Sequence, residues 1–117
     1  MAVDLYACIC VADFATAKAW YMRLLGEPSF IASSTEAVWE LAENRSIAVE
    51  ERDEHAGHGV VTIFVDDFDA RLSEIAGRGI EPAERVTYGN GVRKALFHDP
   101  DGNEIGFGGG PTGGALP

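Results

Sequence analysis

Few residues of this sequence could carry out chemistry, and most of them lie in two short stretches. Cys8 and Cys10 are the only cysteines, and His55 and His58 stand among the acidic residues that follow Glu50. A cysteine thiolate is a nucleophile, and closely spaced histidines beside carboxylates can bind a metal ion. The sequence places no histidine beside the cysteines, so we interpret both as small apolar side chains. We interpret the histidine stretch as a solvated acidic loop, because too few of its donors are fixed on strands.

The composition is that of a globular domain with a strong acidic balance. Of the 117 residues, 46% are hydrophobic and 24% are charged, and the formal net charge is −10. This charge disfavours nucleic acid and anionic membrane as partners, and it is compatible either with simple solubility or with attraction of a cationic ligand. No signal peptide or membrane span is evident, and cysteines two residues apart on a strand do not bridge easily, so we predict a cytoplasmic location.

A repeated pattern organises the elements that must position these residues. Ile-x-Val-x-Asp-Phe occurs at 9–14 and again at 63–68, an offset of 54 residues. Around the first copy, alternating and helical spacing of apolar residues predicts a strand at 5–11 and a helix at 14–25, which Asp13 begins and Gly26 ends. Three further strands are predicted at about 29–33, 36–42 and 46–51.

The second copy of the pattern restarts the same series of elements. A strand is predicted at 60–66, a helix at 68–76 capped by Asp67, and strands at about 83–88, 92–98 and 103–107. Asn90-Gly91 predicts a type I′ hairpin turn, and Asp99-Pro100-Asp101-Gly102 predicts a second turn. We therefore predict an α+β fold in one domain, residues 1–108, built from modules at about 3–53 and 58–108. Residues 109–117 are expected to form a flexible tail.

Two stretches of sequence resemble those of a known family. Val11-x-Asp13-Phe14 with Trp20-Tyr21-x-x-Leu24-Leu25-Gly26 is one, and Phe97-His98-Asp99-Pro100-Asp101-Gly102-Asn103 is the other. Both resemble the vicinal oxygen chelate superfamily, which contains glyoxalases, bleomycin-resistance proteins and dioxygenases. The resemblance covers about residues 3–108 and implies two βαβββ modules that form a curled mixed sheet with an open cup. It also implies a homodimer and, in the enzymes, a divalent metal held by His and Glu from four strands.

The metal-binding positions that the resemblance implies do not carry a set of metal donors in this chain. They fall on Tyr6, Glu50, Val60 and Gly106. Shifting each strand by two residues gives Cys8, Ala48, Thr62 and Gly108, which do not restore a set of His and Glu ligands. We therefore expect no metal and no other cofactor in the cup. An alternative is a relocated metal site formed by Glu50, His58 and Tyr6.

Strand parity predicts which side chains line the cup. The side chains of Leu5, Ile9 and Val11 should pack on a helix, so the alternate residues of that strand face the ligand. On the strand at 36–42 the parity stays open, since either Trp39 and Leu41 or Val38 and Glu40 could face inward. The candidate ligand-binding residues are Tyr6, Cys8, Cys10, Trp39, Glu50, Val60, Thr62, Phe64, Gly106 and Gly108.

The predicted cup contains aromatic rings, small residues and a carboxylate, but it contains no nucleophile paired with a general base. We assign no catalytic residue and favour a metal-independent small-molecule binder that resembles the bleomycin-resistance and drug-sequestering proteins. Glu50 would attract a cationic group, and Tyr6, Phe64 and Trp39 would stack on aromatic rings. The alternatives are a metal-dependent glyoxalase or dioxygenase-type enzyme and a regulatory module that binds another protein.

Overall fold

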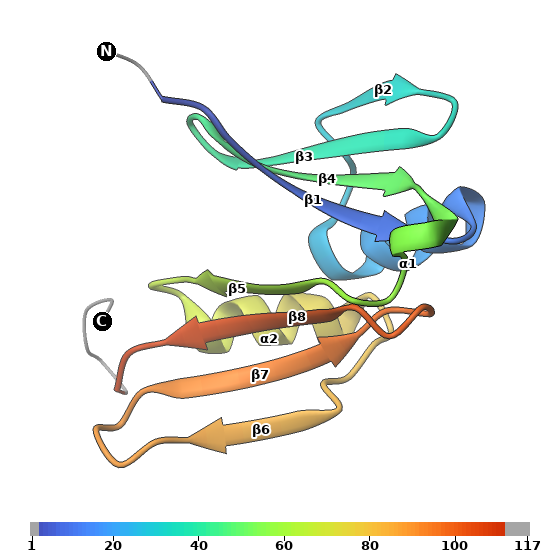
Figure 1. The fold of residues 1–117 in the computed structure, drawn as a ribbon. Helices are drawn as coiled ribbons and strands as arrows, with labels where there is room; N and C mark the ends of the chain where they lie inside the picture. Colours follow the sequence, from blue (N-terminus) through green and yellow to red (C-terminus); the bar gives the residue numbers. More distant parts are fainter. Residues whose placement is uncertain (1–2, 112–117) are drawn as a thin grey trace.

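Two four-stranded sheets, each with one helix, make up the computed structural model, which describes residues 3–111 (Figure 1). The first module contains β1 (Leu5–Val11), α1 (Phe14–Leu25), β2 (Phe30–Ser33), β3 (Glu36–Ala42) and β4 (Arg45–Glu51). A short 3-10 helix, η1 (Asp53–His55), leads to the second module. That module contains β5 (Val60–Phe64), α2 (Phe68–Gly77), β6 (Glu84–Thr87), β7 (Arg93–His98) and β8 (Glu104–Gly109).

The two sheets have the same topology. Their strand orders are β1-β4-β3-β2 and β5-β8-β7-β6. In both, the first strand of the module pairs in parallel with the last, and the other pairs are antiparallel. The edge strands β1 and β5 face each other across the space between the sheets (Figure 1). The predicted α+β fold of two βαβββ modules is confirmed, and the sheets do not close into a barrel.

The two helices begin differently although their first residues match. Asp13 is extended, and its carboxylate accepts hydrogen bonds from the backbone N–H and the hydroxyl of Thr16. Asp67 has a φ of −115° and a ψ of 43° and makes no such bond. Its Oδ2 lies 3.7 Å from an Nη atom of Arg71 one turn later. Asp67 therefore supports α2 through an ion pair rather than through a side-chain cap.

One hydrophobic core fills the helix side of both sheets. Ile9 and Val11 of β1 are buried against α1, and the core continues through Trp39 of β3 to Phe97 of β7. The helices meet at their C-terminal ends, where the guanidinium of Arg78 donates to the carbonyl oxygens of Arg23 and Leu24. The modules are thus joined through their helix sides, and neither buries its sheet alone.

A buried polar cluster, the Asp99 cluster, ties the turn before β8 to the first module. Asp99 accepts four hydrogen bonds: from the hydroxyl of Tyr21 at 2.7 Å, from the side-chain amide of Asn103 at 2.8 Å, and from the backbone N–H groups of Asp101 and Asn103 at 2.9 Å each. The same amide donates to the carbonyl oxygen of Cys10. Burial and the Asp99 carboxylate raise the pKa of the Tyr21 hydroxyl, so it stays a donor.

Two predicted turns can be compared with the backbone. Gly102 has a φ of 94°, as the second predicted turn requires. The type I′ prediction at Asn90-Gly91 is wrong. The N–H of Gly91 donates to Tyr88, the N–H of Tyr88 donates to Val92, and only Gly91 of the loop has a positive φ. A three-residue loop with a left-handed last residue gives this pattern.

The end of the chain also differs from expectation. Gly109, which we expected in the tail, is the last residue of β8. Residues 112–117 lie outside the described part of the chain. Within residues 3–111, no helix has the length and apolar character needed to cross a membrane.

Candidate ligand-binding site

The face of the first sheet that points away from α1, here the open face, carries four of the ten predicted ligand-binding residues. Cross-strand pairing places Cys8 beside Ala48, Ala48 beside Val38, and Val38 beside Phe30. Paired residues point to the same side of a sheet. The remaining residues of this face follow from the same registers: Tyr6, Cys10, Glu36, Glu40, Ser46 and Glu50.

Trp39 does not belong to the open face, so its assignment as a ligand-binding residue is corrected. Its side chain is on the helix side, with 2% of the residue exposed. The indole N–H donates to the carbonyl oxygen of Gly26 at 2.8 Å, and the ring lies 6.1 Å from that of Tyr21. Of the two alternatives for β3, Val38 and Glu40 therefore lie on the open face.

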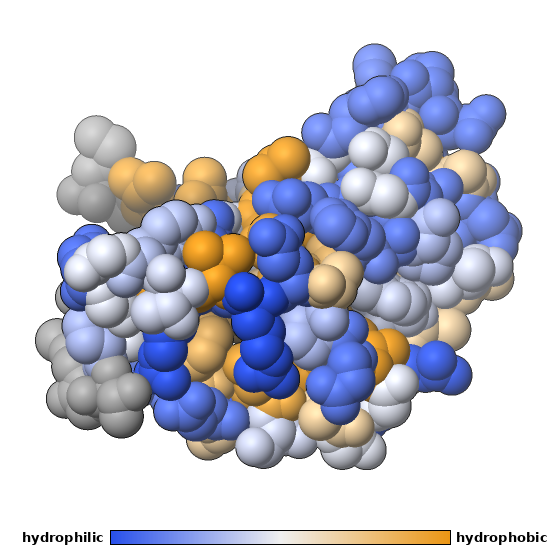
Figure 2. Space-filling model, turned by 90° about the horizontal axis from the view of Figure 1, so that it is seen from below, coloured by the Kyte–Doolittle hydropathy of each residue, from blue (hydrophilic) through white to orange (hydrophobic). Residues whose placement is uncertain are grey.

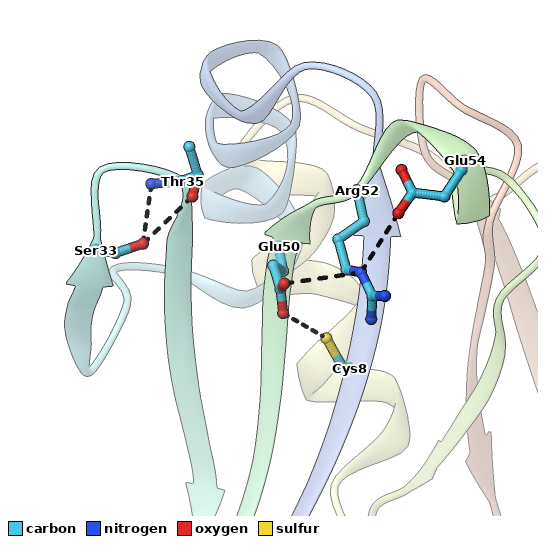
Figure 3. Close-up of polar contacts among 6 residues, drawn as sticks. All are labelled: Cys8, Ser33, Thr35, Glu50, Arg52 and Glu54. Atoms are coloured by element: carbon cyan, nitrogen blue, oxygen red, sulfur yellow. Dashed lines mark hydrogen bonds and ion pairs between the residues drawn. The ribbon is translucent and has the colours of Figure 1, made fainter.

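Acidic side chains gather where β4 ends. Glu36 of β3 is the cross-strand partner of Glu50. Figure 3 shows Glu50 between the thiol of Cys8, 3.5 Å from Oε2, and the guanidinium of Arg52, whose Nε lies 4.0 Å from Oε1. The same Nε is 3.9 Å from Glu54 on η1. Within residues 3–111, Arg52 is the one cation that lies within 4.0 Å of these carboxylates, and its long contacts leave it displaceable.

The thiol of Cys8 is held in its neutral form. Partial burial and the hydrogen bond to Glu50, together with the nearby Cys10, raise the pKa of Cys8 to about 12. A thiol is a nucleophile only when ionised, so Cys8 is unsuited to covalent catalysis near neutral pH. It serves this face as a weak donor and a small apolar group.

The reactivity of Cys8 gives the first prediction. In a Cys10→Ser variant, alkylation of Cys8 by iodoacetamide at pH 8 should be at least about 100-fold slower than that of an unperturbed thiol, because its thiolate is so scarce. The rate should still rise between pH 8 and 10, and it should increase in the additional Glu50→Gln variant. A time course followed by intact mass measures it. Alkylation at the rate of free cysteine would show that the thiol is not neutral.

The open face of the second sheet is less accessible at its glycines than expected. Gly106 and Gly108 pair with Thr62 and Phe64 of β5. A Cβ atom at Gly108 would lie 2.6 Å from the ring of Phe64, and one at Gly106 would lie 3.1 Å from Leu96. Neighbouring side chains therefore cover both glycines, which we predicted as ligand-binding residues.

The aromatic and apolar side chains of β5 remain available. Phe64 is held over Gly108 and stays partly exposed, and Val60 is 71% exposed. Thr62 lies between them on the same face. A ring fixed by its neighbour loses little conformational entropy when a ligand stacks on it.

Two carboxylates of the open faces were missed by the sequence reasoning. Glu104 is the partner of Val60 and of His98, and its Oε1 lies 3.7 Å from Nε2 of His98. Glu104 lies two residues before Gly106 and on the same face of β8, so moving the predicted position back by two residues would have included Glu104. Glu36 is placed beside Glu50 only by the register of β3 and β4, which no short motif in the sequence reveals.

The residues at the metal-binding positions do not fit a divalent ion. Tyr6 pairs with Ser46, whereas Glu50 pairs with Cys10, so four residues or about 13 Å of strand separate Tyr6 from Glu50. Within residues 3–111, no three His, Cys, Asp or Glu side chains are grouped so that they could hold a metal ion. The relocated set of Glu50, His58 and Tyr6 is therefore not brought together.

Comparison with known proteins decides the family. The family model of the "Glyoxalase/Bleomycin resistance protein/Dioxygenase superfamily" matches residues 4–107. The chain belongs to this superfamily. A crystal structure of a glyoxalase/bleomycin resistance protein from Catenulispora acidiphila is 51% identical, with a TM-score of 0.90, and the match covers 94% of this chain and 100% of that one.

Two more distant solved structures share the fold and are named for different functions. Lactoylglutathione lyase from Agrobacterium tumefaciens is 19% identical, with a TM-score of 0.72 and coverages of 94% and 95%. TnmS3, an antibiotic binding protein from Streptomyces sp. CB03234, is 22% identical, with a TM-score of 0.69 and coverages of 94% and 97%. Among curated proteins no match is found. The superfamily fold is shared by an enzyme and a binding protein, so the function depends on the residues of the site.

Proposed function

We propose that this protein binds small cationic aromatic molecules on its open faces without a metal ion and without chemical turnover. The observation that carries the proposal is the cluster at the end of β4, where Glu36 and Glu50 stand side by side with a neutral thiol. A pair of carboxylates with one loosely held guanidinium attracts a cation. The antibiotic-binding function of TnmS3, a protein with the same fold, is compatible with the proposal.

Aromatic rings extend this cluster into a binding surface. Phe30 of β2 is the cross-strand partner of Val38 and therefore lies on the same face as the cluster. Tyr6 lies on β1, at the other end of this face. Both are exposed, as is Phe64 of the second sheet. A planar ligand could stack on these rings while its charged group approaches Glu50, where Arg52 would be displaced.

A matched pair of variants tests the role of charge. Binding of proflavine and bleomycin should be measured by calorimetry, because Trp20 and Trp39 belong to or pack against the core and are poor reporters of the open face. Glu50→Gln should weaken binding about tenfold, which corresponds to about 1.4 kcal/mol. Glu74→Gln removes the same charge from an exposed residue of α2, in the other module, and should change affinity less than about twofold. Equal effects of the two variants, or no binding of either compound, would contradict the proposal.

We also propose that the protein works as a homodimer. Tyr6 and Val60 are 56% and 71% exposed on the open faces, and a second copy could cover part of this apolar surface. Elsewhere, in the view from below, hydrophobic side chains reach the surface as separate patches among hydrophilic ones (Figure 2). Analytical ultracentrifugation at micromolar concentration should give the mass of two chains, and a monomer would disprove this part. The cytoplasmic location stays a prediction.

A further inference from the structure

A cavity lies between the edges of β1 and β5, and residues of the open faces, Ser46, Thr62 and Phe64, contribute to its lining beside residues of the helix side. Its volume is about 340 Å³, which is within the range of small-ligand sites. Most of its wall is apolar and comes from both modules: Leu5, Ala7 and Leu41 from the first, and Val61, Ile63 and Val65 from the second. We call it the inter-module cavity.

Two arginines line this apolar cavity, in a chain with a formal net charge of −10. Arg45 comes from the start of β4, and in the part of the chain that the structure describes no carboxylate lies within 4.0 Å of it. Arg71 comes from the first turns of α2 and has Asp67 at 3.7 Å. The cavity therefore carries positive charge, whereas the open face of the first sheet carries negative charge.

Arg71 also has an unsatisfied donor. Its Nε is buried and, within residues 3–111, has no hydrogen-bond partner. A buried donor without a partner is unfavourable, and native proteins leave few of them. A carboxylate placed on the edge formed by Nε and one Nη would satisfy this donor in the two-bond arrangement that arginine prefers. The long contact to Asp67 permits the small rotation of the guanidinium that this requires.

From these observations we propose that the inter-module cavity binds an amphipathic monocarboxylate, with its carboxylate on Arg71 and its apolar chain between β1 and β5. The apolar walls require a lipophilic chain or ring, and the volume suits about ten carbon atoms. The two arginines select an anion against a cation or a neutral alcohol. This site shares Ser46, Thr62 and Phe64 with the open faces but has the opposite charge preference, and its charged group binds Arg71 rather than the carboxylates beside Glu50, so the two proposals can fail separately.

Sodium decanoate, below the concentration at which it forms micelles, is the probe. Calorimetry should show one saturable site on the wild-type chain, and 1-decanol and decyltrimethylammonium should bind at least about tenfold more weakly. Arg71→Gln should lower the affinity for decanoate at least about tenfold. Arg85→Gln is the matched control, because Arg85 also pairs with a carboxylate four residues away but lies outside the cavity. It should change the affinity less than about twofold, and Glu50→Gln should leave it unchanged.

A further variant keeps the test decisive if Arg71→Gln does not fold. Ala42 is an exposed residue of the cavity wall, so Ala42→Trp should fill the cavity and abolish decanoate binding. The inference is overturned if decanoate shows no saturable binding below about 1 mM. It is equally overturned if decyltrimethylammonium binds as well as decanoate, or if Ala42→Trp binds decanoate normally. If Arg71→Gln instead changes the mass of the assembly in solution, a second copy of the chain occupies the cavity and the inference is wrong.

Discussion

Replacing Asp99 with alanine should lower the free energy of unfolding by about 4 kcal/mol, a large part of the roughly 5–15 kcal/mol typical of a domain. Asp99 is 5% exposed and accepts four hydrogen bonds through its two oxygens. Its removal leaves the hydroxyl of Tyr21 and the side-chain amide of Asn103 buried with donors that have lost their acceptor. Urea denaturation followed by circular dichroism measures the change.

Tyr21→Phe provides the control for this prediction. It removes one of the four bonds and keeps the ring packing, so it should cost about 1–2 kcal/mol. If Asp99→Ala cost no more than Tyr21→Phe, the Asp99 cluster would not act as a unit. A loss below about 1 kcal/mol would show that water replaces the carboxylate in the variant.

Gly57→Ala should destabilise the chain by about 3 kcal/mol, because two separate penalties act at this position. Gly57 has a φ of 88°, which is unfavourable for residues with a side chain. A Cβ atom there would also lie 2.6 Å from the backbone oxygen of Asp101. Backbone atoms cannot rotate away, so the connection between the modules and the turn before β8 would have to separate.

Gly79→Ala isolates the conformational part of that penalty. Gly79 has a φ of 97°, but nothing lies within 4 Å of the position that a Cβ atom would take there. It should therefore cost about 1–2 kcal/mol, and the difference between the two variants measures the contact with Asp101. Equal losses in thermal or urea unfolding would show that the close contact has no energetic effect.

The architecture could be predicted from the sequence because its signals are local and occur twice. The strand, the capped helix and the glycine stop of each module depend on residues close together in the chain, and the resemblance at the two motifs agreed with them. Turn type was harder. Asn90-Gly91 fits a two-residue loop, but Gly91 takes the left-handed position of a three-residue loop instead.

The candidate site was predicted less completely because it depends on contacts between strands. Val38 and Trp39 are both apolar and both buried, so alternation on β3 could not reveal which one faces the helix. The glycines of β8 suggested open space, but the side chains that fill it come from β5 and β7. The bond between Tyr21 and Asp99 joins residues 78 positions apart, and no sequence pattern signals it.

The placement of the Asp99 cluster has a mechanical consequence. Asn103 reaches the carbonyl of Cys10, and Asp101 accepts from the backbone N–H of Ala12, so these bonds all join the end of β1 to the beginning of β8. Together with the shared core and the bonds from Arg78 to the end of α1, they fix the angle between the two sheets at two separate places, so this angle can change only if the interior repacks.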